Sequence, residues 1–289
     1  MQIGIVGLGR MGGNMAERLR RGGHDVVGYA PHNPAAQVHA LPDLVAALAP
    51  PRTVWMMVPS GEVTETTLRE VSDLLSPGDL LIDGGNSYFR DSLRHAGEVE
   101  AKGLMFMDIG TSGGIWGLTE GYCLMAGGSA EAFARIEPAL KTLAAREGYA
   151  HVGPVGAGHF TKMVHNGIEY GMMQAFAEGF EILERSQFAL DLRQIAALWN
   201  HGSVVRSWLL ELTESALAED PKLESLQGYV DDSGEGRWTV FEAIHEDVPA
   251  PVIAMSLFAR FASRDDNAFG MRVLAAMRNK FGGHAIRPA

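Results

Sequence analysis

Four polar side chains within residues 160–174 have types that could bind a ligand or, for three of them, transfer a proton. If this stretch is helical, at about 100° per residue, these side chains share an arc about 100° wide: Lys162, His165, Asn166 and Glu169. Lys162 and Glu169 are seven residues apart, which is roughly 10 Å along a helix axis. A six-carbon ligand fits that span, so the two side chains could act on opposite ends of one ligand.

A solvated charge pair is the alternative for such a face. The glycine-rich turn at residues 153–158 favours a domain cleft beside it instead.

Residues 1–150 alternate short apolar runs with helical stretches. This order predicts an α/β domain with a parallel, doubly wound sheet. Its strands are expected at residues 3–7, 24–29, 53–58, 79–85 and 106–110. The turn at 153–158 would end this domain, which places it at residues 1–155.

The second half has long stretches rich in Ala, Leu, Met and Glu and few β-branched runs, which predicts an all-α domain at residues 156–289. Helices are expected near residues 161–187, 191–218 and 248–278. In the first of them, the face opposite the polar arc is expected to pack against the rest of the domain: Val164, Ile168, Gly171 and Ala175.

A glycine-rich run follows the first expected strand and opens a helix, a context in which G-x-G-x-x-G predicts a Rossmann dinucleotide loop. Gly7 would permit the tight turn, Gly9 would let the backbone approach a pyrophosphate, and Gly12 would allow close packing of helix on strand. The first amides of the helix would bind the anion. A glycine turn without ligand is the alternative. The predicted loop contacts are Gly7, Leu8, Gly9, Arg10, Met11 and Gly12.

The end of the second expected strand should choose between NAD and NADP, because an acidic residue there binds a ribose hydroxyl and repels a 2′-phosphate. Here the segment after Tyr29 has neither a carboxylate nor an arginine. His32 and Asn33 could bind either ribose form, with Arg10 nearby, so the choice stays open with a slight lean toward use of NADP. The remaining predicted cofactor contacts are Ala30, Val58, Pro59 and Asn86.

The overall composition excludes several classes of protein. A formal net charge of −11 argues against nucleic-acid or anionic-membrane partners, which need a basic face. No apolar run reaches the roughly 20 residues of a membrane span, so a cytoplasmic protein is expected.

The single Cys123 excludes an intrachain disulfide, and its apolar neighbours predict a small buried side chain. No His, Asp and Glu cluster at metal-ligand spacing is evident, which predicts chemistry without a metal.

The run KMVHNGIEYG at residues 162–171 resembles the catalytic helix of 6-phosphogluconate dehydrogenases in their shorter bacterial form, within the β-hydroxyacid dehydrogenase superfamily. The IDGGNS turn at 82–87, the SGG loop at 112–114 and the segment 156–160 are similar to the same family in the same order. Taken alone, Asn86 or Ser87 could instead cap the next helix, and the SGG run could be an ordinary strand-end turn.

The resemblance implies oxidative decarboxylation of 6-phosphogluconate to ribulose 5-phosphate. Lys162 would take the proton of the C3 hydroxyl as hydride leaves C3, and Glu169 would protonate C1 of the enediol. A lysine is almost wholly protonated near pH 7, so Lys162 would need burial, for example by closure over a ligand, to favour its neutral amine. Glu169 would have to hold or regain a proton to act as an acid. Oxidation at C3 gives a β-keto acid that can lose carbon dioxide without a metal. The residues implied to hold the substrate carboxylate and hydroxyls are Asn86, Ser112, Gly113, Gly114, His165, Asn166 and Tyr170.

The resemblance also assigns cations to the substrate phosphate. Arg260 looks like the family's phosphate arginine, and Arg278 and His284 match a C-terminal pattern whose members reach into a neighbouring subunit. It therefore implies a homo-oligomer, a dimer or a multiple of one. Arg237 departs from the family, many of whose members have lysine there, which keeps the charge but changes the geometry.

Two other functions fit parts of the pattern. A β-hydroxyacid dehydrogenase that does not decarboxylate would share the cofactor loop, the SGG turn and the helix lysine, but would not need Glu169 together with Arg278 and His284. A catalytically silent nicotinamide-binding sensor would need neither Lys162 nor Glu169.

Overall fold

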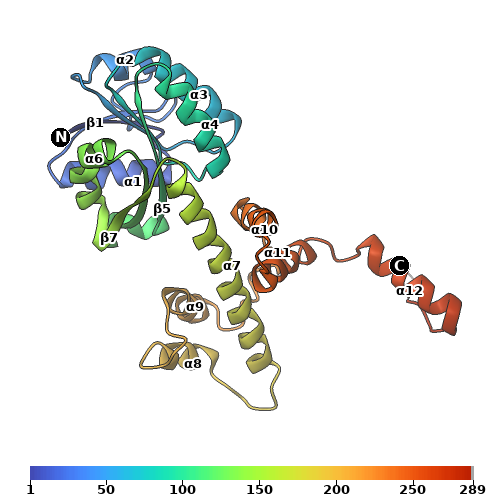
Figure 1. Cartoon of the computed structure of the whole chain (residues 1–289). Coiled ribbons are helices and arrows are strands. Elements are labelled where there is room, and N and C mark those ends of the chain that lie inside the picture. Colours follow the sequence, from blue (N-terminus) through green and yellow to red (C-terminus); the bar gives the residue numbers. More distant parts are fainter. Residues whose placement is uncertain (288–289) are drawn as a thin grey trace. The chain divides into compact units, whose positions relative to one another are not determined.

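The computed structural model describes residues 1–287, so Pro288 and Ala289, at the end of the expected second domain, lie outside the described residues. The chain divides into two compact units, Met1–His165 and the residues from Asn166 onward, which Figure 1 shows along the chain from blue to red. The domain boundary between residues 155 and 156 stays a prediction.

The first unit is built on a seven-stranded sheet with the order β2-β1-β3-β4-β5-β6-β7. Strands β1 to β5 are parallel to their neighbours, β6 runs antiparallel to β5, and β7 is parallel to β6. The five predicted strands are confirmed, whereas β6 and β7 were not predicted. β6 ends in two glycines and β7 mixes small residues with Arg146, Glu147 and His151, so neither is a simple apolar run. The strands are β1 (Gln2–Val6), β2 (Asp25–Tyr29), β3 (Thr53–Met56), β4 (Leu80–Asp83), β5 (Met105–Ser112), β6 (Tyr122–Gly128) and β7 (Ala144–Gly153).

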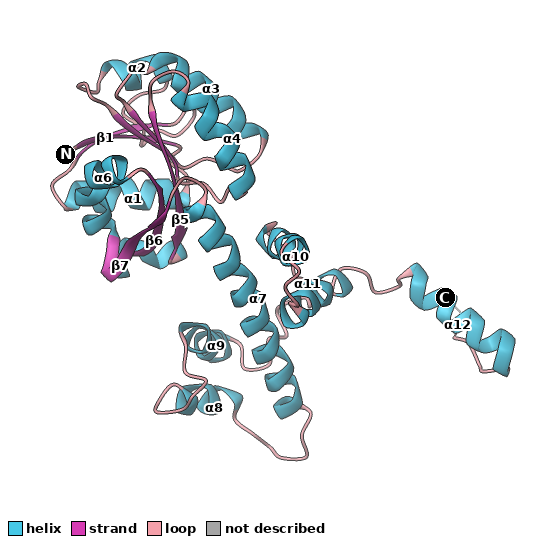
Figure 2. Cartoon of the chain, in the orientation of Figure 1, coloured by secondary structure: helices cyan, strands magenta, loops and turns pink. Residues whose placement is uncertain are grey.

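Alternating side chains of the buried strands supply two cores, one on each face of the sheet, as a period of two requires. Ile3, Ile5 and Trp55 pack with α1 (Arg10–Arg21) and α6 (Ala130–Leu143). Their sequence neighbours Val6, Val54 and Met56 pack on the other face with three further helices (Figure 2): α2 (Leu41–Ala46), α3 (Glu62–Leu74) and α4 (Phe89–Glu100). A 3₁₀ turn η1 (Gly114–Trp116) and the short α5 (Gly117–Glu120) connect β5 to β6.

Helix α7 (Ala157–Glu184) has 28 residues, begins in the first unit and continues into the second. The second unit is helical, as predicted, but two of its expected helices are interrupted. The one expected near 191–218 breaks around Gly202, whose φ is +79°, and the one near 248–278 breaks at residues 263–268. The remaining helices are α8 (Leu192–Trp199), α9 (Trp208–Glu219), α10 (Glu235–His245), α11 (Pro251–Ala262) and α12 (Phe269–Gly282).

One burial prediction is wrong, and a second is wrong in part. Cys123 is exposed, because in β6 it alternates with the buried Tyr122 and Leu124 and so faces the other way. On α7, Ile168 is 54% exposed and Ala175 is exposed as well. Of the other members of the expected packing face, Gly171 is buried and Val164 is half-buried. The prediction for this face is therefore wrong at Ile168 and Ala175, while Lys162 and Asn166 of the polar arc are buried. Among residues 1–287, no helix has the length and apolar character needed to cross a bilayer.

Candidate active site

The glycine loop between β1 and α1 has the geometry of a pyrophosphate cradle. Gly7 has φ of +94°, and a side chain there would meet the carbonyl oxygen of Met57 at 2.5 Å. A side chain on Gly9 would meet no atom within 4 Å, so the loop is open on that side. No side chain caps α1, whose N-cap is Gly9, and its first turn has no acidic residue. These amides therefore fit a dinucleotide phosphate.

The polar side chains predicted at the ribose end are not equivalent. Asn33 donates from Nδ2 to the carbonyl oxygen of Leu8 at 2.7 Å and accepts at Oδ1 from the amide of Ala35. Its side chain thus ties the loop after β2 to the glycine loop. His32 and Arg10 are exposed.

The other predicted cofactor contacts differ in burial. The side chains of Leu8 and Ala30 are 7% exposed and belong to the core, so they can offer mainly backbone atoms to a ligand. Met11 and Val58 are half-buried, and Pro59 is exposed.

The turn after β4 places Asn86 at the surface. The amide of Gly85 donates to Oδ1 of Asp83 at 3.0 Å, and a side chain on Gly85 would lie 2.9 Å from the carbonyl oxygen of Val58. This close approach brings the turn against the end of β3. The alternative that Asn86 or Ser87 caps the next helix is wrong, because α4 has Tyr88 at its N-cap and no side-chain cap.

The SGG loop leaves the sheet at the end of β5. Gly113 and Gly114 have φ of +119° and +53°, conformations that favour glycine. Ser112 Oγ lies 3.5 Å from His165 Nε2. Two predicted substrate residues from distant parts of the sequence therefore meet in the first unit.

Lys162 lies in α7 against the same strand and is 8% exposed. Its approach depends on Gly110, where a side chain would lie 3.1 Å from Lys162 Cγ, 2.8 Å from the Gly158 carbonyl oxygen and closer still to Lys162 Cβ. Glu169 is half-buried in the same helix. Both side chains take part in interactions within the protein. An amine held in a mostly buried position is the environment that a lysine base needs.

The second unit organises the predicted residues that follow on α7. Asn166 donates from Nδ2 to Oε1 of Glu235 at 2.9 Å, and Glu235 is 1% exposed. The hydroxyl of Tyr170 accepts from the amide of Ser233 at 3.1 Å. The guanidinium of Arg260 lies 3.6 Å from the centre of the Tyr170 ring. Asn166, Tyr170 and Arg260 are thus positioned by one set of contacts.

The sequence analysis missed Ser233 and Glu235. Their signal was the polar, glycine-containing run at residues 231–236 before an apolar helical stretch, a pattern typical of a helix start. Such a run places backbone amides and a first-turn carboxylate together. Here it supplies the partners of Tyr170 and Asn166.

Arg237, whose role the sequence leaves open, pairs with Asp232 through two hydrogen bonds of 2.9 and 3.0 Å. Arg264 binds the same carboxylate at 2.8 Å. The hydrogen bonds from Arg237 and Arg264 lower the pKa of Asp232 to about 2. Arg237 is therefore engaged in an ion pair beside the segment that holds Tyr170.

The C-terminal residues predicted to bind the substrate phosphate lie in an exposed segment. Arg278 in α12 and His284 after it are exposed. The same helix exposes large apolar side chains: Phe269, Met271, Val273, Leu274 and Met277.

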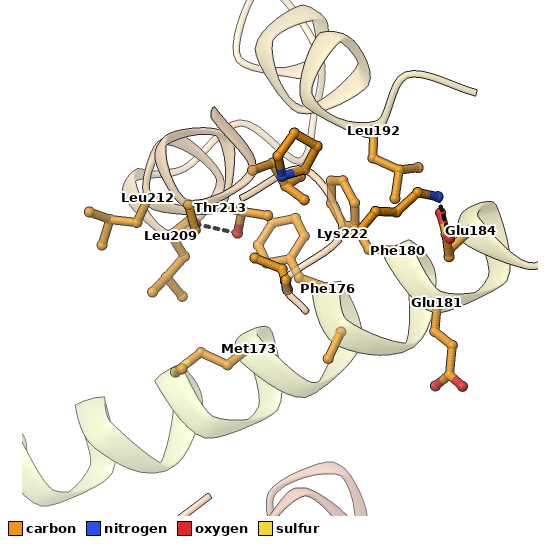
Figure 3. Close-up of a pocket in the computed structure, with 15 residues that line it drawn as sticks. Met173, Phe176, Phe180, Glu181, Glu184, Leu192, Leu209, Leu212, Thr213 and Lys222 are labelled. Carbon is orange, nitrogen blue, oxygen red and sulfur yellow. Dashed lines mark hydrogen bonds and ion pairs between the residues drawn. The ribbon is translucent and has the colours of Figure 1, made fainter. Parts of the chain in front are cut away.

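One apolar cavity of about 560 Å³ lies among α7, α8 and α9 in the second unit. Figure 3 shows Phe176 and Phe180 pointing from α7 toward it. The one cation of its lining, Lys222, is paired with Glu184 at 2.6 Å. An anionic sugar acid finds no available cation among these residues, so this cavity is not the candidate substrate site.

One group of metal-ligand side chains escaped the sequence analysis. Glu242, His245 and Glu246, at the end of α10, have ligand atoms within 4.8 Å of one another. The expectation that such residues do not cluster is therefore wrong here. Glu242 is buried and the other two are exposed.

Comparison with protein families gives two matches that together cover most of the chain. Residues 2–153 match the family described as the NAD binding domain of 6-phosphogluconate dehydrogenase. Residues 158–280 match the family described as the C-terminal domain of 6-phosphogluconate dehydrogenase.

Two curated proteins are similar over nearly their whole length. A protein of Bacillus subtilis, provisionally named a 6-phosphogluconate dehydrogenase, is 46% identical over 99% of both chains. The NAD(+)-dependent, decarboxylating 6-phosphogluconate dehydrogenase of Haloferax volcanii is 40% identical over 99% of this chain and 98% of its own.

Among solved structures, the 6-phosphogluconate dehydrogenase of Plasmodium falciparum has a TM-score of 0.82 and 26% identity, covering 100% of this chain and 67% of the other. That protein was solved with NADP+ and with 6-phosphogluconate. The 3-hydroxyisobutyrate dehydrogenase of Mycobacterium tuberculosis has a TM-score of 0.72 at 23% identity, covering 96% and 99%. The second likeness concerns the fold alone.

Proposed function

Because the chain belongs to the family of 6-phosphogluconate dehydrogenases, we propose that it converts 6-phosphogluconate to ribulose 5-phosphate and carbon dioxide with reduction of NAD or NADP. The observation that carries the proposal is the placement of Lys162 and Glu169 on one helix, with the lysine almost fully buried against the strand that leads into the SGG loop.

In this reaction the chain's own groups accept and donate protons. Lys162 accepts the proton of the C3 hydroxyl as C3 is oxidised to a ketone. The bound cofactor supplies the acceptor for the hydride. The C1–C2 bond of the resulting β-keto acid then breaks, the carboxylate leaves as carbon dioxide, and the electron pair passes to the C3 oxygen, which takes its proton back from Lys162 to give the enediol. Glu169 delivers a proton to C1 of the enediol while Lys162 removes the proton of the neighbouring hydroxyl, which gives the ketopentose phosphate.

The substrate is held by groups that the fold has already oriented. The hydrogen bonds from Asn166 to Glu235 and from Ser233 to Tyr170 fix two of them. Arg260, stacked on Tyr170, is proposed to bind the phosphate, since a guanidinium matches phosphate oxygens well. The other substrate contacts are proposed to come from Asn86, Ser112, Gly113, Gly114 and His165.

For the cofactor, the backbone of residues 7–12 is proposed to hold the pyrophosphate. The strand end offers neither a carboxylate nor an arginine after Tyr29, and Asn33 is engaged with Leu8. Use of both NAD and NADP is therefore proposed, with His32 and Arg10 at the ribose.

The complete site is proposed to need a second copy of the chain, whose Arg278 and His284 would join the phosphate. Exposed apolar residues on α11 and α12 support this, because large apolar patches mark interaction surfaces. Among them are Val252 (68% exposed), Met255 (63%), Phe269 (72%) and Met271 (64%).

The test is to incubate the protein with 6-phosphogluconate and each cofactor, and to follow reduced cofactor and carbon dioxide together. Equal amounts of both are expected. Reduced cofactor without carbon dioxide would identify a β-hydroxyacid dehydrogenase that does not decarboxylate, and cofactor binding with neither product would identify a sensor.

Matched variants assign the two roles. Lys162→Met and Glu169→Gln should each lower kcat by about 10²–10⁴-fold, as expected when a general base or acid is lost. Lys141→Met, which removes a lysine exposed in α6 and paired with Glu137, should not. Glu178→Gln, which changes an exposed carboxylate of α7 bound to Gln174, should likewise keep activity.

A further inference from the structure

Strand β5 docks the start of α7 through every second residue. Asp108, Gly110 and Ser112 point to one face of the strand, as a period of two requires. Along α7 the matching contacts fall at His159, Lys162 and His165, three residues apart. The three contacts differ in chemistry. Asp108 accepts hydrogen bonds from backbone amides, Gly110 allows close approach of the helix, and the hydroxyl of Ser112 lies beside the imidazole of His165.

Asp108 brings to this contact a buried carboxyl group that the proposed reaction does not use. Asp108 is 0% exposed. Its Oδ1 accepts from the amide of Gly156 at 2.6 Å, and its Oδ2 accepts from the amide of His159 at 2.7 Å. Helix α7 begins at Ala157, so these amides flank its first turn. A carboxylate from the sheet thus caps a 28-residue helix and lies at the positive end of its dipole.

The surroundings leave this first turn little room to shift. A side chain on Gly127 would lie 2.5 Å from Asp108 Oδ1 and 2.7 Å from the amide nitrogen of Gly158. His159 is 1% exposed, and its Nδ1 lies 2.7 Å from Ser92 Oγ on α4. Glycine on the strand side and a buried histidine on the helix side therefore fix the helix start from two directions.

From this geometry we propose that Asp108 is the positioning residue for Lys162. By capping the first turn of α7, Asp108 fixes where Lys162 lies along β5. Lys162 is about one helical turn beyond His159, whose amide Asp108 binds. The inference rests on the proposed function only in naming Lys162 as the base. That Asp108 holds the start of α7 in place can be tested without turnover.

The main variant is Asp108→Asn, which keeps the shape but replaces one acceptor by an NH₂ group facing a backbone N–H. The matched control is Asp79→Asn. Asp79 is 1% exposed and also accepts from two backbone amides, those of Arg52 at 2.6 Å and Ser76 at 2.9 Å, but it lies between β3 and β4 rather than at α7. Both variants should unfold at lower temperature than the parent chain.

Kinetics separate positioning from general damage. With rates expressed per cofactor-binding site, Asp108→Asn should lower kcat by about 10²-fold, the cost of a misplacement of about 1 Å, while KM for the cofactor changes less than about twofold. Asp79→Asn should leave both constants within about twofold. Equal losses of kcat in the two variants, or an unchanged kcat in Asp108→Asn, would overturn the proposal.

Hydrogen exchange on the full chain gives a readout that needs no activity. Amides at residues 157–160 should exchange faster in Asp108→Asn and keep the parent rate in Asp79→Asn. Unchanged exchange in Asp108→Asn refutes the capping role. If the parent chain does not oxidise 6-phosphogluconate, the proposed function fails, but this exchange result still decides whether Asp108 holds the helix.

Discussion

Replacing Gly110 by alanine is the sharpest test of how the fold places Lys162. The added methyl carbon would lie 2.8 Å from the Gly158 carbonyl oxygen, about 0.6 Å short of the 3.4 Å where ordinary contact begins, and 3.1 Å from Lys162 Cγ. Lys162 Cβ is nearer still. Because two of the clashing atoms belong to the stem of Lys162 and one to the helix backbone, the helix has to move.

Two magnitudes follow from this clash. Overpacking of this kind costs about 1–3 kcal/mol of unfolding free energy. A displacement of the catalytic group approaching 1 Å lowers the rate by about 10²-fold. Gly110→Ala should therefore be a folded protein of reduced stability that binds cofactor with normal affinity but turns over 6-phosphogluconate about a hundred times more slowly.

The control is Gly97→Ala in α4, where a side chain would meet no atom within 4 Å. In a helix this change should stabilise the protein by about 0.5–1 kcal/mol and leave kcat unchanged. The assays are urea unfolding and steady-state kinetics on both variants. A Gly110→Ala protein that is less stable yet keeps full kcat would refute the idea that this glycine sets the position of Lys162.

Three further outcomes are expected. Gly9→Val should unfold at the parent temperature, since a side chain there meets no atom within 4 Å. It should raise KM for NAD at least about tenfold, because the side chain fills the space for the pyrophosphate. An unchanged KM for NAD would exclude the loop as the pyrophosphate site. Between pH 6 and 2.5 the urea midpoint should fall. Hydrogen bonds from Arg94 and then His95 lower the pKa of Glu65 from 4.5 to about 2, so its stabilising contribution is complete above pH 4.5 and is lost as the pH falls toward 2. Glu65→Gln should have a shallower slope, and an identical slope would show that Glu65 contributes nothing. Arg260→Lys should raise KM for 6-phosphogluconate about tenfold with a smaller change in kcat, because lysine cannot reproduce the guanidinium stacked on Tyr170. An unchanged KM for 6-phosphogluconate would show that Arg260 does not bind the phosphate.

Local spacing determined much of this protein. The run from Gly7 to Gly12 follows β1 and opens α1 as predicted, because the turn chemistry of glycine is a property of a few neighbouring residues. The five apolar strands and the helical second half were visible for the same reason. The positions of Lys162 and Glu169 on one helix follow directly from their separation in the sequence.

Most of the misses occur where burial depends on partners far along the chain. The partly exposed strand β7 and the exposed Cys123 of β6 depend on how strands pair at the sheet edge. The helix near 191–218 divides at Gly202, and the exposed apolar face at Ile168 contradicts a rule based on amphipathic pattern alone. At β7, Cys123 and Ile168, the position in the tertiary structure outweighs local preference. The break at Gly202 is different, because a glycine with positive φ is a local signal that the sequence already carries.

Sequence alone determined which residues could act, since residue type and helical spacing need no knowledge of the rest of the chain. Only the tertiary structure decided what holds them. In the sequence, Asp108 is simply an acidic residue within an apolar strand, and Glu235 is an acidic residue at a helix start. Their roles, at the first turn of α7 and at Asn166, depend on contacts across 51 and 69 residues. Buried carboxylates need partners, but which partners they find is fixed by how sheet and helix pack.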